Sequence, residues 1–344
     1  YVDEEDLFEV SDVELKKAAP ENLYTPDVEK ILAALEEDLQ VVYTVDPKEV
    51  APVIEKWAEA MKAEVESLSS FGAIVRHRGQ AAKDFVNDSR TTVVPAKAVW
   101  TVKPPSKKGD GFKRKCRVVA CGNFAQKDGS VDLYSSGAAA EVVRMVVAMA
   151  AHHKWDLATI DVKNAFLRAP IPDGPQRFGM RPPKALVAAG LVEPDELWEC
   201  FHAVYGWRQS PKWWGNHRDK IMKRATWSTR GKQYNLKSCG ENLWAVVEGN
   251  EVRGYVVVYV DDLLLAMDAE IAHPLLAWIN EQWECSPPQR DDIRFLGMEI
   301  KKLPSGGYTL SQEGYIAEVL RAHDVTEKAI LPAPKELLSL DEKT

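Results

Sequence analysis

Two adjacent carboxylates, Asp261 and Asp262, stand between two apolar segments rich in β-branched and aromatic residues, 255–260 and 263–267. Such flanks predict the two strands of a β-hairpin, with the Asp pair as the tight turn. Two anions at the tip of an apolar hairpin resist burial unless a cation lies beside them. Mg²⁺, which prefers carboxylate oxygen, is the simplest such cation. A solvated Asp-Asp turn is the alternative, because Asp is a favoured turn residue.

A third carboxylate, Asp161, ends a short predicted strand that begins near Trp155, and the next residues turn into a helix. If this strand lies beside the hairpin, three carboxylates converge and can hold two Mg²⁺ ions. One ion would activate an attacking hydroxyl and the other would neutralise the leaving phosphates. Asp161 and Asp261 would then bridge the metals. Asp262 would be more peripheral, because adjacent strand residues point to opposite sides.

The net charge of −8 is unevenly distributed along the chain. Residues 1–70 hold 6 basic and 19 acidic residues, whereas residues 71–128 hold 13 basic and 4 acidic residues, a net charge of +9. This block is a candidate phosphate-contacting surface, with a solvated charged hairpin as the alternative. Lys103 leaves one predicted strand and four cations between Lys113 and Arg117 enter the next. A hairpin with so many cations can close over a triphosphate.

The bulk composition narrows the class of protein. With 344 residues, 45% hydrophobic and 28% charged, the chain predicts a soluble protein of two or three subdomains. It has no apolar run of 18 residues, so we expect no membrane partner. Five scattered cysteines argue against a zinc site and favour reduced intracellular thiols. The acidic N-terminus without an initiator Met predicts a fragment of a longer, non-secreted chain.

Hydrophobic periodicity and turn residues predict the elements that would position these groups. Residues 1–48 are expected to be loosely ordered, apart from a helix over 27–39. Residues 168–197 are rich in Pro and Gly and predict an excursion from the core. The remaining expected elements are helices over 50–68, 141–153, 205–225, 270–283 and 312–322 and strands over 73–76, 93–95, 99–103, 117–120, 197–203, 239–248, 293–300 and 307–310.

The motifs in this order resemble the reverse transcriptase region of copia-type LTR retrotransposon polyproteins, over roughly residues 50–322. The resemblance is carried by Trp57-Ala58-Glu59-Ala60-Met61, Trp100 to Lys103, Arg117-Val118-Val119-Ala120, Asp161-Val162-Lys163-Asn164-Ala165-Phe166-Leu167, Tyr205-Gly206-Trp207-Arg208-Gln209-Ser210-Pro211, Tyr259-Val260-Asp261-Asp262, Phe295-Leu296-Gly297-Met298-Glu299-Ile300, and Ser311-Gln312 with Tyr315. Two departures stand out. Cys121 occupies a position where the family usually has a basic residue, and 134–139 lacks a Pro that the family often has.

The resemblance implies an α+β, right-hand polymerase fold with fingers, an antiparallel-sheet palm and the beginning of a thumb. It implies four regions. These are an acidic, loosely ordered N-terminal segment (1–48), fingers with an N-terminal helix (49–154), a palm with the 168–197 excursion and the 205–225 helix (155–302), and the start of the thumb or connection with a loose tail (303–344).

The resemblance also implies roles for individual residues. Phe166 would lie under the sugar of the incoming nucleotide and select deoxynucleotides, with core packing as the alternative. The other roles are catalysis (Asp161, Asp261, Asp262), metal binding (the same three with Val162), nucleotide binding (Val162, Lys103, Arg117, Lys115, Tyr205, Gly206, Gln209) and the grip on the primer end (Leu296, Gly297, Met298).

The expected function is an RNA-directed DNA polymerase that uses two Mg²⁺ ions, or Mn²⁺ in their place. Its partners would be an RNA or DNA template with its primer, deoxynucleoside triphosphates, and other parts of a retroelement polyprotein. The expected location is a cytoplasmic particle or the nucleus. We see no ribonuclease H, integrase or protease region in the sequence. Two alternatives stay open: a catalytically inactive or co-opted fragment that binds nucleic acid or protein, and an RNA-dependent RNA polymerase, which Phe166 opposes.

Overall fold

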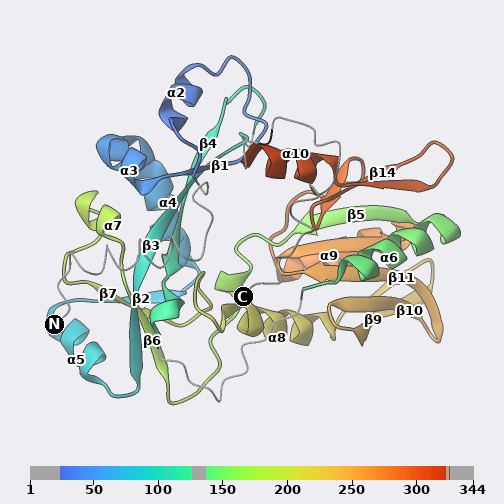
Figure 1. Ribbon diagram of the computed structural model, residues 1–344. Coiled ribbons are helices and arrows are strands. Elements are labelled where there is room, and N and C mark those ends of the chain that lie inside the picture. Colours follow the sequence, from blue (N-terminus) through green and yellow to red (C-terminus); the bar gives the residue numbers. More distant parts are fainter. Residues whose placement is uncertain (1–23, 106, 126–136, 323–324, 326–344) are drawn as a thin grey trace, which may run out of the picture.

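The computed structural model describes residues 24–105, 107–125, 137–322 and 325, which form two large sheets and a smaller one (Figure 1). The helices are α2 (Val28–Ala33), α3 (Pro47–Val50), α4 (Ala58–Ser70), α5 (Gly79–Asn87), α6 (Ala140–His153), α7 (Lys184–Ala188), α8 (Ser210–Met222), α9 (Ala269–Gln282) and α10 (Glu313–Ala322), with 3₁₀ helices η1 (Ala51–Trp57), η2 (Gly122–Phe124) and η3 (Phe166–Arg168). The strands are β1 (Tyr43–Val45), β2 (Ile74–His77), β3 (Thr91–Lys103), β4 (Lys113–Ala120), β5 (Asp156–Asp161), β6 (Arg177–Arg181), β7 (Leu197–Cys200), β8 (Thr226–Thr229), β9 (Lys232–Gly240), β10 (Leu243–Glu248), β11 (Glu251–Tyr259), β12 (Asp262–Met267), β13 (Ile293–Phe295), β14 (Met298–Lys302) and β15 (Tyr308–Ser311).

The first sheet has the strand order β1-β3-β6-β7-β2, and β4 pairs with β3. Its long β3–β4 hairpin alternates in burial, so that Trp100, Val102 and Val118 point into one core. Helix α4 adds Met61 and Leu68 to the same core. This period-2 alternation against a period-3.6 helix is the usual way in which a strand pair and a helix bury apolar surface together.

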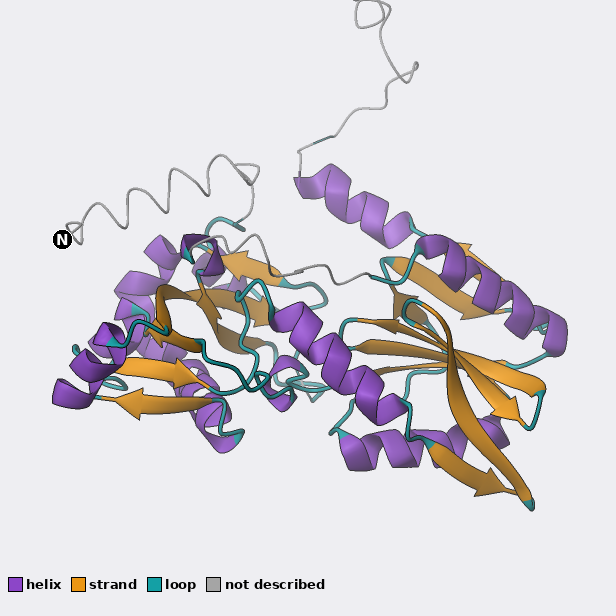
Figure 2. Ribbon diagram, turned by 90° about the horizontal axis from the view of Figure 1, so that it is seen from below, coloured by secondary structure: helices purple, strands orange, loops and turns teal. Residues whose placement is uncertain are grey.

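The second sheet is antiparallel throughout, with the order β5-β12-β11-β10-β9-β8. Leu263 and Leu265 of β12 face a core shared with α8 and α9, whereas Leu264 and Ala266 face the core under α6. Helices therefore lie on both sides of this sheet (Figure 2). Burial on both faces explains why residues 255–258 of β11 and 263–267 of β12 are continuously apolar rather than alternating with polar residues.

The segment 168–197, which the sequence predicts as an excursion, leaves the second sheet and contributes to the first. Its strand β6 pairs in parallel with β3, from Thr91↔Arg177 to Pro95↔Arg181, and antiparallel with β7. Strand β7 then pairs with β2. The excursion supplies the interior strand β6, and β7, which begins at its last residue, supplies the next one. The two sheets are therefore built from interleaved pieces of the chain.

The expectation that residues 1–48 are loosely ordered is wrong for residues 24–48. Val28 and Leu32 of α2 are buried in the first core, together with Leu39 and Val45. Strand β1 pairs with β3. The acidic composition misleads here because the apolar residues are few but sit at positions that face one core. Residues 1–23 lie outside the described part, and the predicted helix over 27–39 ends at Ala33.

The third sheet, β13-β14-β15, packs with α6 against the second sheet. The α+β class with an antiparallel sheet is confirmed, and the expected helices over 141–153 and 270–283 are found as α6 and α9. None of the helices among the described residues is both long and apolar enough to cross a membrane. Of the expected tail, only Val325 from 323–344 is described.

Candidate active site

The acidic hairpin differs by one residue from the prediction. Tyr259 pairs with Asp262, so the two-residue turn is Val260-Asp261 and Asp262 is the first residue of β12. The Asp pair as the tight turn is therefore wrong. Asp is favoured in turns, but here the ladder extends to Asp262 and leaves the β-branched Val260 in the turn.

Val260 has a left-handed backbone with φ of +53°, which is unfavourable for a β-branched residue. Two hydrogen bonds hold the turn in this conformation. The indole Nε1–H of Trp214 donates to the Val260 carbonyl at 2.6 Å, and the Val162 amide donates to the Asp261 carbonyl at 2.9 Å. Such strain persists only where the surroundings fix it, and it is characteristic of functional sites. The sequence did not reveal this role for Trp214.

The strand that carries Asp161 lies beside the hairpin, as predicted. Strand β5 pairs with β12 so that Asp161 stands directly opposite Asp262. Directly opposed residues of an antiparallel pair project from the same face. The backbone of Asp161 is also bound on its other side, because its amide donates to Ser286 Oγ at 2.9 Å and its carbonyl accepts from the Ser286 amide at 2.8 Å. That Asp262 is the more peripheral carboxylate stays a prediction.

The three carboxylates disfavour one another's charge. Burial, followed by the charges of Asp261 and Asp161, raises the pKa of Asp262 to about 7. Burial and the Asp261 charge likewise raise the pKa of Asp161. Carboxylates kept close together at the end of an apolar sheet fit a hard divalent cation, which would offset their charge. Within the described residues the side chains do not form a ready-made metal cluster, so a bound ion would have to draw them together.

Five cations of the β3–β4 hairpin share one face. Lys97 and Lys113 are exposed, and the other three are partly buried. The register pairs Thr101 with Lys115 and Val99 with Arg117, which puts Lys103, Lys115 and Arg117 on the same side of the hairpin. Arg114 faces the opposite side, where it bonds Glu29 at 2.7 Å. The basic block therefore divides into a cationic face and a structural part.

This cationic face is turned toward the carboxylates. Burial and then the Arg117 charge lower the pKa of Lys103, while Asp161 and Asp261 act in the opposite direction. Burial and the charges of Arg117 and Lys103 also lower the pKa of Lys115. None of the ion pairs between described residues includes Lys103, Lys115 or Arg117. The arrangement leaves three cations available for an anionic ligand.

Aromatic contacts link the cationic face to Phe166, which follows Asp161 in the chain. The guanidinium of Arg117 lies 4.5 Å from the ring centroid of Tyr205, and the rings of Tyr205 and Phe166 meet edge to face at 5.0 Å. Burial raises the pKa of the Tyr205 phenol. The next residue, Gly206, has φ of +91°, and a Cβ atom there would lie 1.9 Å from the Ala120 carbonyl oxygen. Only glycine fits this close approach of two backbones.

The remaining predicted site residues are placed as follows. Val162 is buried directly after β5, and Gln209 is the N-cap residue of α8. Leu296 and Gly297 form a two-residue turn between β13 and β14, with φ of +53° and +69°. Met298 is buried on the α6 side of the second sheet.

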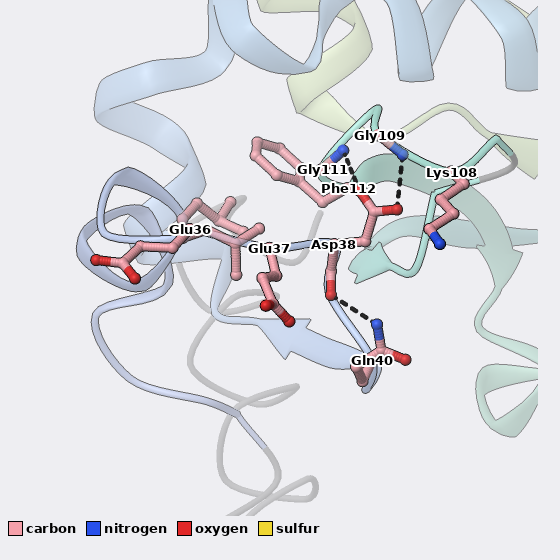
Figure 3. Close-up of a pocket in the computed structure, with 10 residues that line it drawn as sticks. Glu36, Glu37, Asp38, Gln40, Lys108, Gly109, Gly111 and Phe112 are labelled. Atoms are coloured by element: carbon pink, nitrogen blue, oxygen red, sulfur yellow. Dashed lines mark hydrogen bonds between the residues drawn. The ribbon is translucent and has the colours of Figure 1, made fainter.

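The loop at the tip of the β3–β4 hairpin is anchored to the segment that follows α2. The Asp38 carboxylate accepts hydrogen bonds from the amides of Gly109 at 2.7 Å and Gly111 at 2.9 Å, beside a pocket that also contains Lys108 and Phe112 (Figure 3). The tip of the hairpin is thereby tied to the N-terminal part of the first sheet, a contact that the sequence did not reveal.

Comparison with known proteins places this arrangement in a family. A family model described as "Reverse transcriptase (RNA-dependent DNA polymerase)" matches residues 83–336. The chain belongs to this reverse transcriptase family. The Retrovirus-related Pol polyprotein from transposon RE1 of Arabidopsis thaliana is 27% identical over 299 residues, which are 83% of this chain and 18% of the relative. The corresponding polyprotein from transposon TNT 1-94 of Nicotiana tabacum is 26% identical over 254 residues, 70% of this chain and 17% of that relative.

These relatives confirm the resemblance to copia-type retrotransposon reverse transcriptases, and the chain spans less than a fifth of their length. Among solved structures, the foamy viral protease-reverse transcriptase in complex with dsDNA is 16% identical with a TM-score of 0.40, covering 82% of this chain and 46% of that chain. In the terms of the reverse transcriptase fold, we call the second sheet with its helices the palm and the first sheet with its helices the fingers.

Proposed function

We propose that this reverse transcriptase chain is an RNA-directed DNA polymerase that adds deoxynucleotides to a primer 3′ hydroxyl. The observation that carries the proposal is the opposition of two charged groups. Asp161, Asp261 and Asp262 gather at one end of the palm sheet, and three cations without ion-pair partners among the described residues face them from the fingers. A triphosphate needs cations along its phosphates and a metal-holding acidic group beside the reacting phosphorus.

The acidic group would hold two Mg²⁺ ions, or Mn²⁺, through Asp161, Asp261, Asp262 and Val162. When bound, such ions lower the pKa of the attacking hydroxyl and offset the charge of the leaving phosphates. The raised pKa values of Asp161 and Asp262 support this assignment, because the site carries more negative charge than its protein surroundings can stabilise.

The protein's own side chains would bind and orient the substrates. Lys103, Lys115 and Arg117 would bind the triphosphate from the fingers. Tyr205, Gly206 and Gln209 would lie near the nucleotide and template, and the Leu296-Gly297-Met298 turn would hold the primer end. Phe166 would contact the sugar, and its edge-to-face contact with Tyr205 supports a fixed ring that excludes a 2′ hydroxyl. The template, primer and deoxynucleotides are thus the proposed ligands, within a retroelement polyprotein in a cytoplasmic particle or the nucleus.

Primer extension tests the polymerase assignment. The purified chain, with poly(rA) template, oligo(dT) primer, dTTP and Mg²⁺, should extend the primer. Asp161→Asn should reduce the rate on the order of 10³-fold, because it removes a carboxylate from the proposed metal site. Asp156→Asn is the matched control at the other end of β5, where the side chain bonds Lys302. An Asp161→Asn variant as active as the parent would refute the assignment.

Two further outcomes separate the alternatives. Salt-dependent binding to an RNA–DNA hybrid with no incorporation by the parent would favour a fragment that binds without catalysis. Efficient use of ribonucleotides by the parent would favour an RNA-dependent RNA polymerase. If Phe166 excludes the 2′ hydroxyl, Phe166→Ala should raise the ratio of rNTP to dNTP incorporation at least tenfold, on the order expected for relief of one steric clash.

A further inference from the structure

Glu64 has no place in the proposed chemistry, yet it contacts the strand that carries the cations. It lies on α4 next to the buried face formed by Met61, Val65 and Leu68 and is itself only partly exposed. Its carboxylate oxygen Oε1 accepts a hydrogen bond from the backbone amide of Val118 in β4, at 2.8 Å. A helix side chain thereby binds directly to the main chain of the strand.

That hydrogen bond closes an open edge. Among the described strands, β4 pairs only with β3, so the backbone groups on its other side have no strand partner. Two amides on this side, two residues apart, find partners elsewhere. Val118 donates to Glu64, and Ala120 donates to the Tyr205 carbonyl at 2.7 Å. These two bonds fix β4 immediately after Lys115 and Arg117.

The charge of Glu64 fits a role through the backbone. Burial raises the pKa of Glu64, against the lowering effects of the Val118 amide and of the nearby Lys115 and Arg117 charges. No ion pair between described residues joins Glu64 to either cation. Glu64 therefore lies close to Lys115 and Arg117 without forming an ion pair with either among the described residues, and both cations stay available for a ligand.

We propose that Glu64 is a positioning residue of the nucleotide site. Its hydrogen bond to Val118 holds β4 in the position from which Lys115 and Arg117 can contact a triphosphate bound beside the palm carboxylates. The proposal rests on the polymerase function, since it assumes a triphosphate at that place. A role of this kind affects nucleotide affinity and leaves the chemical step and the binding of template largely unchanged.

The decisive variants separate the hydrogen bond from the charge. Glu64→Leu removes the acceptor and leaves the Val118 amide unpaired, which should weaken dTTP binding and raise its KM roughly tenfold, with kcat changed less than about threefold. Glu64→Gln keeps an acceptor oxygen at the same reach and should stay within about twofold of the parent. Glu66→Leu is the matched control on the same helix, because Glu66 is exposed and its ion pair with Lys62 is at 4.0 Å.

Amide hydrogen exchange supplies a readout that does not depend on catalysis. In Glu64→Leu the Val118 amide should exchange at least tenfold faster than in the parent, on the scale of one lost hydrogen bond. Faster exchange with unchanged dTTP affinity would show a merely structural contact and overturn the proposal. Unchanged exchange would overturn it as well. If Glu64→Leu does not fold, Glu64→Asp withdraws the acceptor by one methylene, and parent-like dTTP affinity in that variant would contradict positioning.

The two proposals fail in different ways. If the parent extends no primer, the polymerase function fails, but direct measurement of dTTP affinity by calorimetry still tests Glu64. Tenfold weaker binding by Glu64→Leu than by Glu64→Gln then supports the positioning role, and equal binding overturns it.

Discussion

Two clusters of charge in this molecule are built in opposite ways. At the far side of the fingers, the buried carboxylate of Glu196 accepts from Arg76, from Arg78 at 2.9 Å and from the indole of Trp198. Next to it, Glu199 accepts from both Nε and Nη2 of Arg177 at 2.8 Å, and it bonds His77 at 2.9 Å. We call these residues the fingers network. In the candidate active site, by contrast, three carboxylates stand together and three cations stand together without ion pairs among the described residues.

The shifts of pKa record the difference. In the fingers network, hydrogen bonds from Arg and His or Trp outweigh burial and lower the pKa of Glu196 and Glu199. In the active site, burial and like charges raise the pKa of Asp161 and Asp262. The carboxylates of the fingers network obtain their hydrogen-bond and ion-pair partners when the chain folds. The active-site cluster stays unfavourable until a ligand of opposite charge arrives, and this distinguishes charges that stabilise a fold from charges that serve binding.

The largest effect is expected in the fingers network. The Glu196 side chain is 0% exposed, and Glu196→Ala removes the acceptor shared by two partly exposed guanidinium groups and a buried indole N–H. We expect the free energy of unfolding to fall by about 2–3 kcal/mol. Chemical denaturation measures it, with the exposed Glu193→Ala as control. A loss below about 1 kcal/mol would place this network with ordinary surface ion pairs and remove the contrast.

Removing one active-site cation should weaken ligand binding and leave the stability of the fold unchanged or slightly higher. Lys115→Met takes away a charge that has no ion pair among the described residues, so the melting temperature should hold or rise slightly. The affinity for dTTP should fall roughly tenfold, as for one lost charge-assisted contact. Lys83→Met, which changes an exposed lysine on α5, is the control for both measurements. Marked destabilisation with unchanged dTTP affinity would mean that Lys115 serves the fold.

Neutralising one carboxylate should stabilise the protein without metal. Asp262→Asn relieves repulsion from Asp261 and Asp161, and we expect a gain of about 1 kcal/mol, or roughly 2–4 °C in the melting temperature in EDTA. Added Mg²⁺ should raise the melting temperature of the parent more than that of the variant, because binding to the native state stabilises it. Glu281→Gln, exposed on α9, is the control. A lower melting temperature for Asp262→Asn in EDTA would show that the acidic group is not strained.

The smallest expected effect is on the free energy of unfolding at acidic pH. The pKa of Glu199 is lowered, so the unfolded chain takes up this proton near pH 4.5 whereas the folded chain takes it up only at lower pH. The stability that Glu199 contributes is complete above that range and is lost as the pH falls through it. Between pH 5 and pH 4, the parent should lose more stability than Glu199→Gln, by at most about 0.7 kcal/mol. Parallel pH profiles of the two proteins would contradict a charged Glu199 in the network.

Local pattern was enough to predict the centre of the palm. The apolar flanks of Asp261-Asp262 and the strand before Asp161 are visible in any short window of the sequence, and so are α6 and α9. The motif order then indicated the family. The turn itself was misplaced because residue preference favours Asp there, whereas the paired ladder and the Trp214 hydrogen bond put Val260 into a left-handed conformation.

Contacts between residues far apart in the sequence could not be predicted from local pattern. Strand β6 pairs with β3, although a Pro- and Gly-rich stretch surrounds it and the paired residues Thr91 and Arg177 are 86 positions apart. Glu64 looks like any solvent-facing acid on α4, since nothing local shows that the open edge of β4 lies next to it. The role of Asp38 depends on a loop 71 residues away. Each of these features depends on tertiary pairing, which local propensity does not encode.

The interleaving of the two sheets also sets the order in which the molecule can be completed during synthesis. Strand β2 cannot pair until β7 has been synthesised, because Ile74 pairs with Cys200. Likewise, β5 with Asp161 cannot pair until β12 with Asp262 has been synthesised. The first sheet of the fingers cannot be completed until β5 of the palm has already left the ribosome. The nascent chain must carry β2 and β5 with unpaired edges over more than a hundred residues of elongation, the state in which strands most readily pair with the wrong partner.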